Sequence, residues 1–257
     1  MNYNICMKKL FFILIVSLIF FTNNVAYSST DKETLIILDQ SASMLDSFRD
    51  STKINYAIKA VKSIVNSMPE SESVGLRTVG VHPVLMFSLI RQNPNALCEA
   101  TILLNKIQTN NRQNINNSLL SIMPSGASPL QYTLETAINH DFYLNTRLKH
   151  IILVTDGYEN CDGDPCGYIR RIMISRDDIK IDVVGIGLNS EDKNMLGCLT
   201  SETKGQILDF NRPADISPIT SQLTGINPSF NTPTTTYNTQ PVKHTIKKQS
   251  YLMEFYE

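Results

Sequence analysis

The sequence has no surplus of basic residues over acidic ones, and this absence limits the partners that it can have. It contains 23 lysine and arginine residues and 24 aspartate and glutamate residues, so its formal net charge is −1. A protein that captures nucleic acid through the phosphate backbone needs a surface with excess positive charge. Composition therefore gives no support for a nucleic-acid partner.

The sequence also lacks the motifs of many hydrolases and phosphate-binding enzymes. It contains no glycine-rich phosphate loop and no serine nucleophile elbow. Its four histidines are scattered along the chain, at His82, His140, His150 and His244. We therefore do not expect an enzyme.

A long hydrophobic run is missing as well. The most apolar segment, residues 11–21, is shorter than the roughly 20 residues that a membrane-spanning helix needs. It follows two lysines and precedes small residues at Ala26 and Ser28, an arrangement typical of a secretory signal peptide. We predict a signal peptide over residues 1–28 and an exported mature protein, in the periplasm, at the cell surface or secreted. The alternative is an uncleaved anchor, which would be the protein's one attachment to a membrane.

The cysteines beyond the signal peptide are even in number: Cys98, Cys161, Cys166 and Cys198. In an oxidising compartment this favours disulfides, and no second pair of Cys or His residues has the spacing of a zinc site. Of the three pairings we expect Cys161–Cys166, across a turn-forming segment at residues 162–165, which leaves Cys98 with Cys198. Two aspartates in that turn could form a calcium-type site, although a solvated acidic loop is the simpler interpretation.

Short apolar runs alternate with helical periodicity along most of the chain. Buried strands are predicted at 34–38, 150–155 and 181–186, and further strands at 74–81, 84–90, 100–104 and 206–209. Helices are predicted at 54–68, 115–122, 130–138, 169–174, 195–200 and 216–223. Strands that alternate with helices indicate an α/β protein with an open, doubly wound, mainly parallel sheet flanked by helices.

Polar side chains cluster where two of these strands end. Asp39 follows the first strand and Asp156 follows the strand at 150–155, and the carboxyl ends of parallel strands meet at one edge of a sheet. Ser41 and Ser43 occupy alternate positions after Asp39, which brings both hydroxyls to its side of the loop. Ser128, in the segment PSGASPL, is expected to be the N-cap of the next helix.

Five oxygen donors with two negative charges predict a site for Mg²⁺ or Mn²⁺ rather than zinc. They leave room for water and one outside ligand. Each residue also has an ordinary interpretation: Ser128 as a helix start, Asp156 as part of a turn, and the two loop serines as partners of loop amides. Their shared position at the strand ends of one sheet favours the metal site.

The segments ILDQSAS, GASPL and LVTDG resemble the von Willebrand factor type A domain between about residues 34 and 223. VTDGYENCDGDPC is similar to exported bacterial members of that family. The resemblance implies a Rossmann-like domain over residues 29–225. Beyond it the composition is rich in Thr, Asn and Pro, which indicates a linker and tail over residues 226–257.

The resemblance also implies roles for the five oxygen-bearing residues, in a metal-ion-dependent adhesion site. Ser41 and Ser43 would bind the metal directly, Ser128 directly or through water, and Asp39 and Asp156 largely through water. Ser128 stands where the family usually has threonine, so the hydroxyl is kept and the methyl group is lost.

The implied function is a binding module whose metal accepts an aspartate or glutamate from a partner protein. One alternative is a metal-dependent hydrolase. A phosphatase similar to the haloacid dehalogenases would want an aspartate in place of Ser41 and a lysine in a later loop, and neither is found. The other alternative is a scaffold domain with a vestigial metal site.

Overall fold

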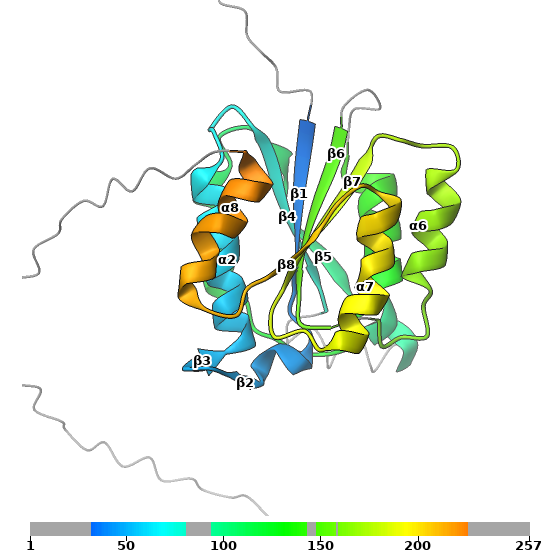
Figure 1. Ribbon diagram of the computed structural model, residues 1–257, viewed down its shortest axis with the longest axis horizontal. Helices are drawn as coiled ribbons and strands as arrows, with labels where there is room; N and C mark the ends of the chain where they lie inside the picture. The colour runs from blue at the N-terminus through cyan, green and yellow to red at the C-terminus, as the bar shows by residue number, and fades with distance from the viewer. Residues whose placement is uncertain (1–31, 81–93, 143–147, 158, 226–257) are drawn as a thin grey trace, which may run out of the picture.

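The computed structural model describes residues 32–80, 94–142, 148–157 and 159–225. These residues form a six-stranded sheet in the order β5-β4-β1-β6-β7-β8, in which the edge strand β5 alone is antiparallel to its neighbour (Figure 1). The strands are β1 (Lys32–Asp39), β4 (Ser73–Val79), β5 (Thr101–Gln108), β6 (Leu148–Thr155), β7 (Ile179–Gly185) and β8 (Ile207–Asp209). The expected open, mainly parallel sheet is confirmed. The predicted signal peptide, the strand at 84–90 and the tail lie outside the described residues.

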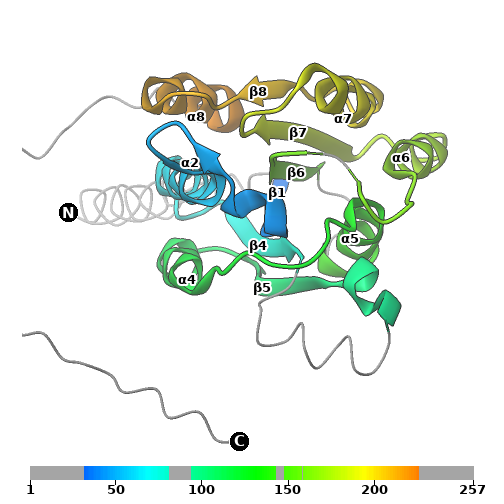
Figure 2. The same ribbon diagram turned by 90° about the horizontal axis from the view of Figure 1, so that it is seen from below.

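Helices cover both faces of the sheet (Figure 2). One face carries α2 (Lys53–Ser67), α4 (Arg112–Ser118) and α8 (Ile216–Thr224), and the other carries α5 (Leu130–Thr136), α6 (Pro165–Met173) and α7 (Ser190–Glu202). Shorter elements complete the fold: the 3-10 turns η1 (Ala42–Leu45), η2 (Pro94–Glu99), η3 (Leu119–Ser121) and η5 (Pro213–Asp215), the π-turn η4 (Ala137–Asp141), and the hairpin of β2 (Ser47–Phe48) and β3 (Ser51–Thr52). Within the described ranges, no helix is both long and apolar enough to cross a membrane.

The central strand β1 explains the two-sided core. Ile36 and Leu38 pack with α2, α4 and α8, whereas Leu35 and Ile37 pack with α5, α6 and α7. All four side chains are fully buried. A strand that is covered on both faces has to be apolar throughout, which is the pattern of buried parallel sheets. Each such side chain contributes roughly 1.5–3 kcal/mol through removal of its surface from water.

Helix α2 follows its predicted periodicity and ends where proline requires. Ile54, Ala57, Val61 and Ile64 recur every three or four residues and are buried against the sheet. The helix stops at Ser67, and the next residue, immediately before a proline, is extended. A proline disfavours helical backbone in the residue that precedes it.

The strand order places the reversal point of the sheet between β1 and β6. From β1 the chain passes through α2 to β4 on one side, and the later parallel strands β6, β7 and β8 lie on the other. In open α/β sheets, ligands bind at the carboxyl ends of the strands beside such a reversal. Asp39 ends β1 and Asp156 directly follows β6, so the fold brings the two predicted carboxylates to this point.

An ion-pair cluster stabilises the opposite end of the sheet, and it gives a pH prediction. Arg176 and the buried Lys149 both donate hydrogen bonds to Asp178, and these interactions, above all that with Arg176, lower the pKa of Asp178 to about 2. A carboxyl group with a lowered pKa stabilises the fold above its ordinary value of 3.8, and this contribution is lost as the pH falls towards 2. We expect Asp178→Asn to lower the free energy of unfolding by about 1–2 kcal/mol at neutral pH.

Urea denaturation of wild type and Asp178→Asn across the acid range would measure this effect. The difference between the two proteins should shrink as the pH falls below the ordinary aspartate value. A difference that does not change with pH would show that the carboxylate charge is not what stabilises this end of the sheet.

Candidate metal site

The first loop of the site begins at Asp39, whose side chain is almost wholly buried. Its Oδ1 accepts a hydrogen bond from the backbone amide of Ser41 at 2.8 Å, and its Oδ2 accepts one from the Thr155 hydroxyl at 2.6 Å. The Ser128 hydroxyl lies 3.4 Å from the same Oδ2. Asp39 therefore joins the ends of β1 and β6 to the loop before α5.

The two serines extend this network towards Asp156. Their hydroxyl oxygens lie 3.1 Å apart, and Ser43 donates a hydrogen bond to Oδ1 of Asp156 at 2.9 Å. The loop is held in place by Met44, which is fully buried against the core on the α2 side. Ser41 is extended, but Ser43 lies in the 3-10 turn η1, so the two hydroxyls meet through this turn and not through the predicted alternation along an extended loop.

The second loop is joined to the first through its backbone. The amide of Ala42 donates to the carbonyl of Gly126, and the amide of Ser125 donates to the carbonyl of Gln40. Gly80, at the end of β4, has a φ of +84°, and a Cβ there would lie 3.1–3.2 Å from backbone atoms of both loops. A side chain at Gly80 would therefore push the two loops apart.

The role of Ser128 differs from the one expected from the sequence. The N-cap of α5 is Pro129, and the Ser128 side chain does not cap this helix. The Ser128 hydroxyl instead faces Asp39, while its amide donates to the Asn160 side chain at 2.7 Å. The sequence predicts that this serine caps the helix, but its hydroxyl donates to the Asp39 carboxylate at the end of β1 instead.

The structure thus brings together all five residues named from the sequence: Asp39, Ser41, Ser43, Ser128 and Asp156. Burial raises the pKa of Asp39, and the charge of Asp156 adds to this, whereas hydrogen bonds from Thr155 and Ser41 oppose it. Two buried carboxylates with hydroxyls between them form a region of negative potential that a small hard cation fits.

The donor atoms of this site indicate which metal ion it can hold. In the described part of the chain, no group of three or more His, Cys, Asp or Glu side chains could hold a metal ion. This site has two carboxylates, and hydroxyl groups supply its other donors. Such an oxygen set suits magnesium or manganese and is a poor match for the usual ligands of zinc.

Sequence reasoning missed two residues at the site. Thr155, the last residue of β6, contacts Asp39, and Lys53, the first residue of α2, places its ammonium 2.7 Å from Oδ2 of Asp156. Thr155 could have been found from the sequence, because it is a polar residue at the end of an apolar strand, just before Asp156. Lys53 could not have been found from the sequence, because a lysine on an amphipathic helix normally faces solvent.

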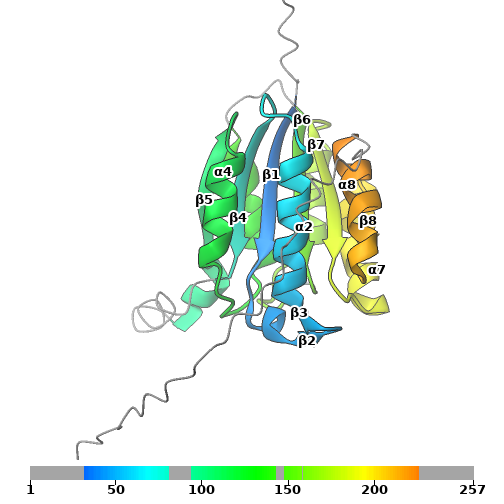
Figure 3. The same cartoon turned by 90° about the vertical axis from the view of Figure 1, so that its left-hand side faces the viewer.

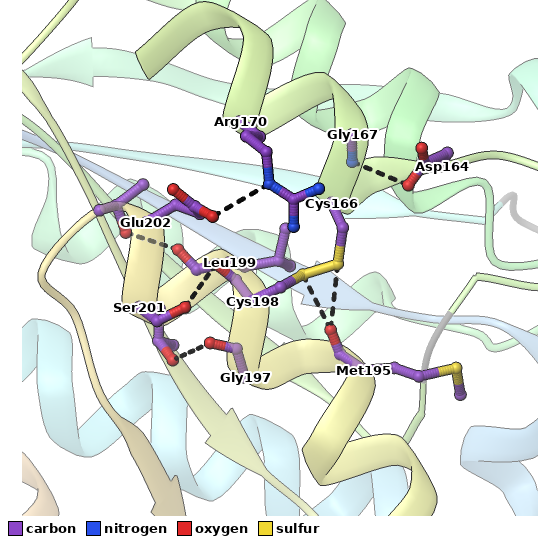
Figure 4. The surroundings of a disulfide bond; sticks show 12 residues. Asp164, Cys166, Gly167, Arg170, Met195, Gly197, Cys198, Leu199, Ser201 and Glu202 are labelled. Carbon is purple, nitrogen blue, oxygen red and sulfur yellow. Dashed lines mark hydrogen bonds and ion pairs between the residues drawn. A yellow bond between two sulfur atoms is a disulfide. The ribbon is translucent and has the colours of Figure 1, made fainter. Parts of the chain in front are cut away.

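The disulfides differ from the predicted pairing. The bonds join Cys98 to Cys161 and Cys166 to Cys198, with Cα separations of 5.4 and 5.8 Å, so the expectation of Cys161–Cys166 and Cys98–Cys198 is wrong. The segment between Cys161 and Cys166 starts a helix instead of closing a hairpin. Asp164 caps α6 by accepting a hydrogen bond from the amide of Gly167, as Figure 4 shows.

Helix geometry explains the partners that the two cysteines have. Cys166 lies in the first turn of α6 and faces α7, which carries Cys198 (Figure 4). Cys161 lies before the helix and pairs with Cys98 in η2. This second bond ties the loop that follows Asp156 to the segment before β5.

Comparison with known proteins identifies the family to which this fold belongs. The family model for the von Willebrand factor type A domain matches residues 32–208, and the chain belongs to that family. Among curated proteins, it is 26% identical to the uncharacterized protein YwmC of Bacillus subtilis (strain 168), over 84% of this chain and 97% of that protein.

Solved structures share the fold. An aerotolerance-related membrane protein from Bacteroides fragilis NCTC 9343 matches with a TM-score of 0.58 and 16% identity, over 76% of this chain and 98% of that one. Proximal thread matrix protein 1 from the mussel byssus, with zinc in its metal-ion-dependent adhesion site, matches with a TM-score of 0.54 and 15% identity, over 75% and 44%. At these identities the likeness establishes the fold alone.

Proposed function

We propose that this domain is an exported, metal-dependent protein-binding module, which recruits an aspartate or glutamate of a partner protein through Mg²⁺ or Mn²⁺. The observation that carries the proposal is the meeting of two buried carboxylates and three hydroxyls at the reversal point of the sheet. The mussel protein with a zinc-occupied adhesion site supports a divalent ion at the corresponding place.

A bound divalent ion would supply a Lewis-acidic centre for an outside carboxylate. The hydroxyl oxygens of Ser41 and Ser43 would hold it directly, and Ser128 would do so directly or through water. Asp39 is already oriented by Thr155 and by the Ser41 amide, so its carboxylate would orient bound water. Because neutral hydroxyls are the direct ligands, the site keeps its attraction for an anion from outside.

Two further features support this proposal over an enzyme. His150 lies at the other end of β6, where it pairs with the buried Asp182 at 2.7 Å, and His140 lies in η4, so neither is a base for the site. Ser41 stands where a haloacid-dehalogenase-type hydrolase would want its second aspartate. A vestigial scaffold is disfavoured because the full donor set is present and mutually oriented.

Export is part of the proposal and rests on separate observations. The two disulfides are typical of an oxidising compartment, and the N-terminal segment has the pattern of a signal peptide. In such a compartment the partner would be a protein of the cell envelope, of the surface or of the medium.

The test is metal titration followed by capture. The full chain should bind Mn²⁺ or Mg²⁺ with saturable heat, and a metal concentration of about 100 times Kd should stabilise it by about 2.7 kcal/mol. Envelope proteins retained on the immobilised chain should be released by a chelator and retained again after Mg²⁺ is restored. Absence of both heat and thermal shift with either ion would contradict the proposal.

A further inference from the structure

Lys53 occupies an unusual place for a lysine. It is the first residue of α2, where the positive end of the helix dipole disfavours a cation, and the first turn of the helix carries no acidic residue. Its ammonium lies 2.7 Å from Oδ2 of Asp156 and 3.2 Å from Oδ2 of Asp46. Helix preference does not account for this position, but the ion pair with Asp156 does.

The two oxygens of Asp156 are divided between different partners. Oδ1 accepts the hydrogen bond from Ser43, and Oδ2 accepts that from Lys53. The side chain of Asp156 is 3% exposed and that of Lys53 is 18% exposed, so water screens this pair weakly. One carboxylate of the candidate metal site is therefore neutralised by a cation that the chain itself supplies.

The backbone fixes this arrangement. The Lys53 amide donates to the carbonyl of Asp46, which directly follows η1, at 3.1 Å. The hairpin β2–β3 lies between these two residues, and Figure 3 shows it at the lower end of the sheet, beneath α2. Lys53 is thus anchored to the same loop that carries Ser41 and Ser43.

We propose that Lys53 is a built-in competitor of the divalent ion, a residue that sets the metal affinity of the site. This inference rests on the proposed function. With Lys53 in place, Asp39, Asp156 and Lys53 together carry one net negative charge instead of two. The ammonium weakens the attraction for Mg²⁺ or Mn²⁺ and holds Asp156 in position, and an acidic partner then adds the anionic charge that Lys53 offsets.

The experiment is Mn²⁺ titration of the full-length Lys53→Met protein by calorimetry, with the thermal midpoint in chelator as a second readout. Removing a unit positive charge this close to the site should tighten Mn²⁺ binding by about tenfold or more. Without Mn²⁺ the midpoint should fall, because the carboxylates lose their counter-charge, and Mn²⁺ should raise it further than in wild type.

Two controls separate charge at the site from charge in general. Lys59→Met makes the same charge change on an exposed part of the same helix, and it should leave Mn²⁺ affinity unchanged. Lys53→Arg keeps the charge, and it should keep the affinity close to the wild-type value. If Lys53→Met does not fold, Lys53→Gln provides the same test with a polar side chain.

Each outcome bears on one proposal or on both. Tighter binding by Lys53→Met supports the competitor role, and so does binding by the variant alone. Equal affinity of wild type and variant overturns the role of Lys53 and leaves the metal-dependent module intact. Absence of Mn²⁺ binding in every protein overturns both, and weaker binding by Lys53→Met would instead make Lys53 a supporting residue of the site.

Discussion

Replacing Asp39 with asparagine should weaken Mg²⁺ and Mn²⁺ binding by about a hundredfold or more while the protein stays folded. Asparagine keeps the size of the side chain, and its oxygen can still accept the hydrogen bond from the Ser41 amide, while its amino group can donate to the Thr155 hydroxyl. It removes one of the two negative charges that attract the cation. Calorimetry with Mn²⁺ would measure the loss, and chelator-sensitive capture of a partner should disappear with it.

In chelator, the free energy of unfolding of Asp39→Asn should rise above that of wild type or stay close to it. Asp39 is 1% exposed and lies near Asp156, so its charge carries the cost of burial and of repulsion in the folded protein. Asparagine removes both costs, whereas alanine would also leave the partners of the carboxylate unsatisfied, at about 1–3 kcal/mol. From the sequence, Asp39 is expected to behave as a surface group, so that even alanine costs little. Because Asp39 is in fact buried, asparagine tests the role of its charge better than alanine does.

The control is Asp209→Asn, which makes the same charge change at an exposed aspartate paired with Lys193. It should leave Mn²⁺ affinity unchanged. A large drop in the thermal midpoint of Asp39→Asn in chelator would mean that Asp39 is structural. Normal partner capture by this variant would show that the adhesion-site interpretation is wrong.

Replacing Arg77 with methionine should lower the free energy of unfolding by about 3–5 kcal/mol. Arg77, on β4, donates two hydrogen bonds to Asp141 at 2.6 and 2.7 Å, and a third to Thr101 at 3.0 Å. The side chains of the pair are only 6% and 3% exposed. Methionine would leave the Asp141 carboxylate buried without its guanidinium, and an uncompensated buried charge is far more costly than a lost surface contact.

Urea denaturation would measure this loss, and two further variants show its cause. Arg77→Met combined with Asp141→Leu removes both charges, so it should recover most of the lost stability. Arg170→Met breaks a more exposed ion pair, with Glu202, and should cost at most about 1 kcal/mol. If Arg77→Met also lost no more than about 1 kcal/mol, burial would not be what makes the Arg77–Asp141 pair important for stability.

The parts of the fold that the sequence predicts well are those governed by local periodicity. β1 is apolar throughout because both of its faces are covered, and α2 repeats apolar residues every three or four positions until Pro69. The meeting of Asp39 and Asp156 was also predictable. Parallel strands end at one edge, so polar residues directly after two such strands converge there.

The parts that could not be predicted depend on where side chains point. The pairing of Cys166 with Cys198 depends on the face of α6 that meets α7, and spacing along the chain favours the wrong neighbour. Lys53 could not be told from an ordinary solvent-facing lysine, because its partner is 103 residues away. Ser128 shows the same limit, since its hydroxyl prefers a distant carboxylate to the adjacent helix.

The disulfide between Cys98 and Cys161 closes a covalent ring that contains β5 and β6 but neither of the strands between them. Because β5 and β6 are not neighbours in the sheet, formation of this disulfide alone does not pair any two adjacent strands. β4 and β1 have to insert between the ring's two strands before the sheet is complete, and only that insertion brings Asp39 to Asp156. An ion bound at this site would then bind the finished sheet and no earlier state, so chains that had formed the ring before β1 was in place would gain no stability from the metal.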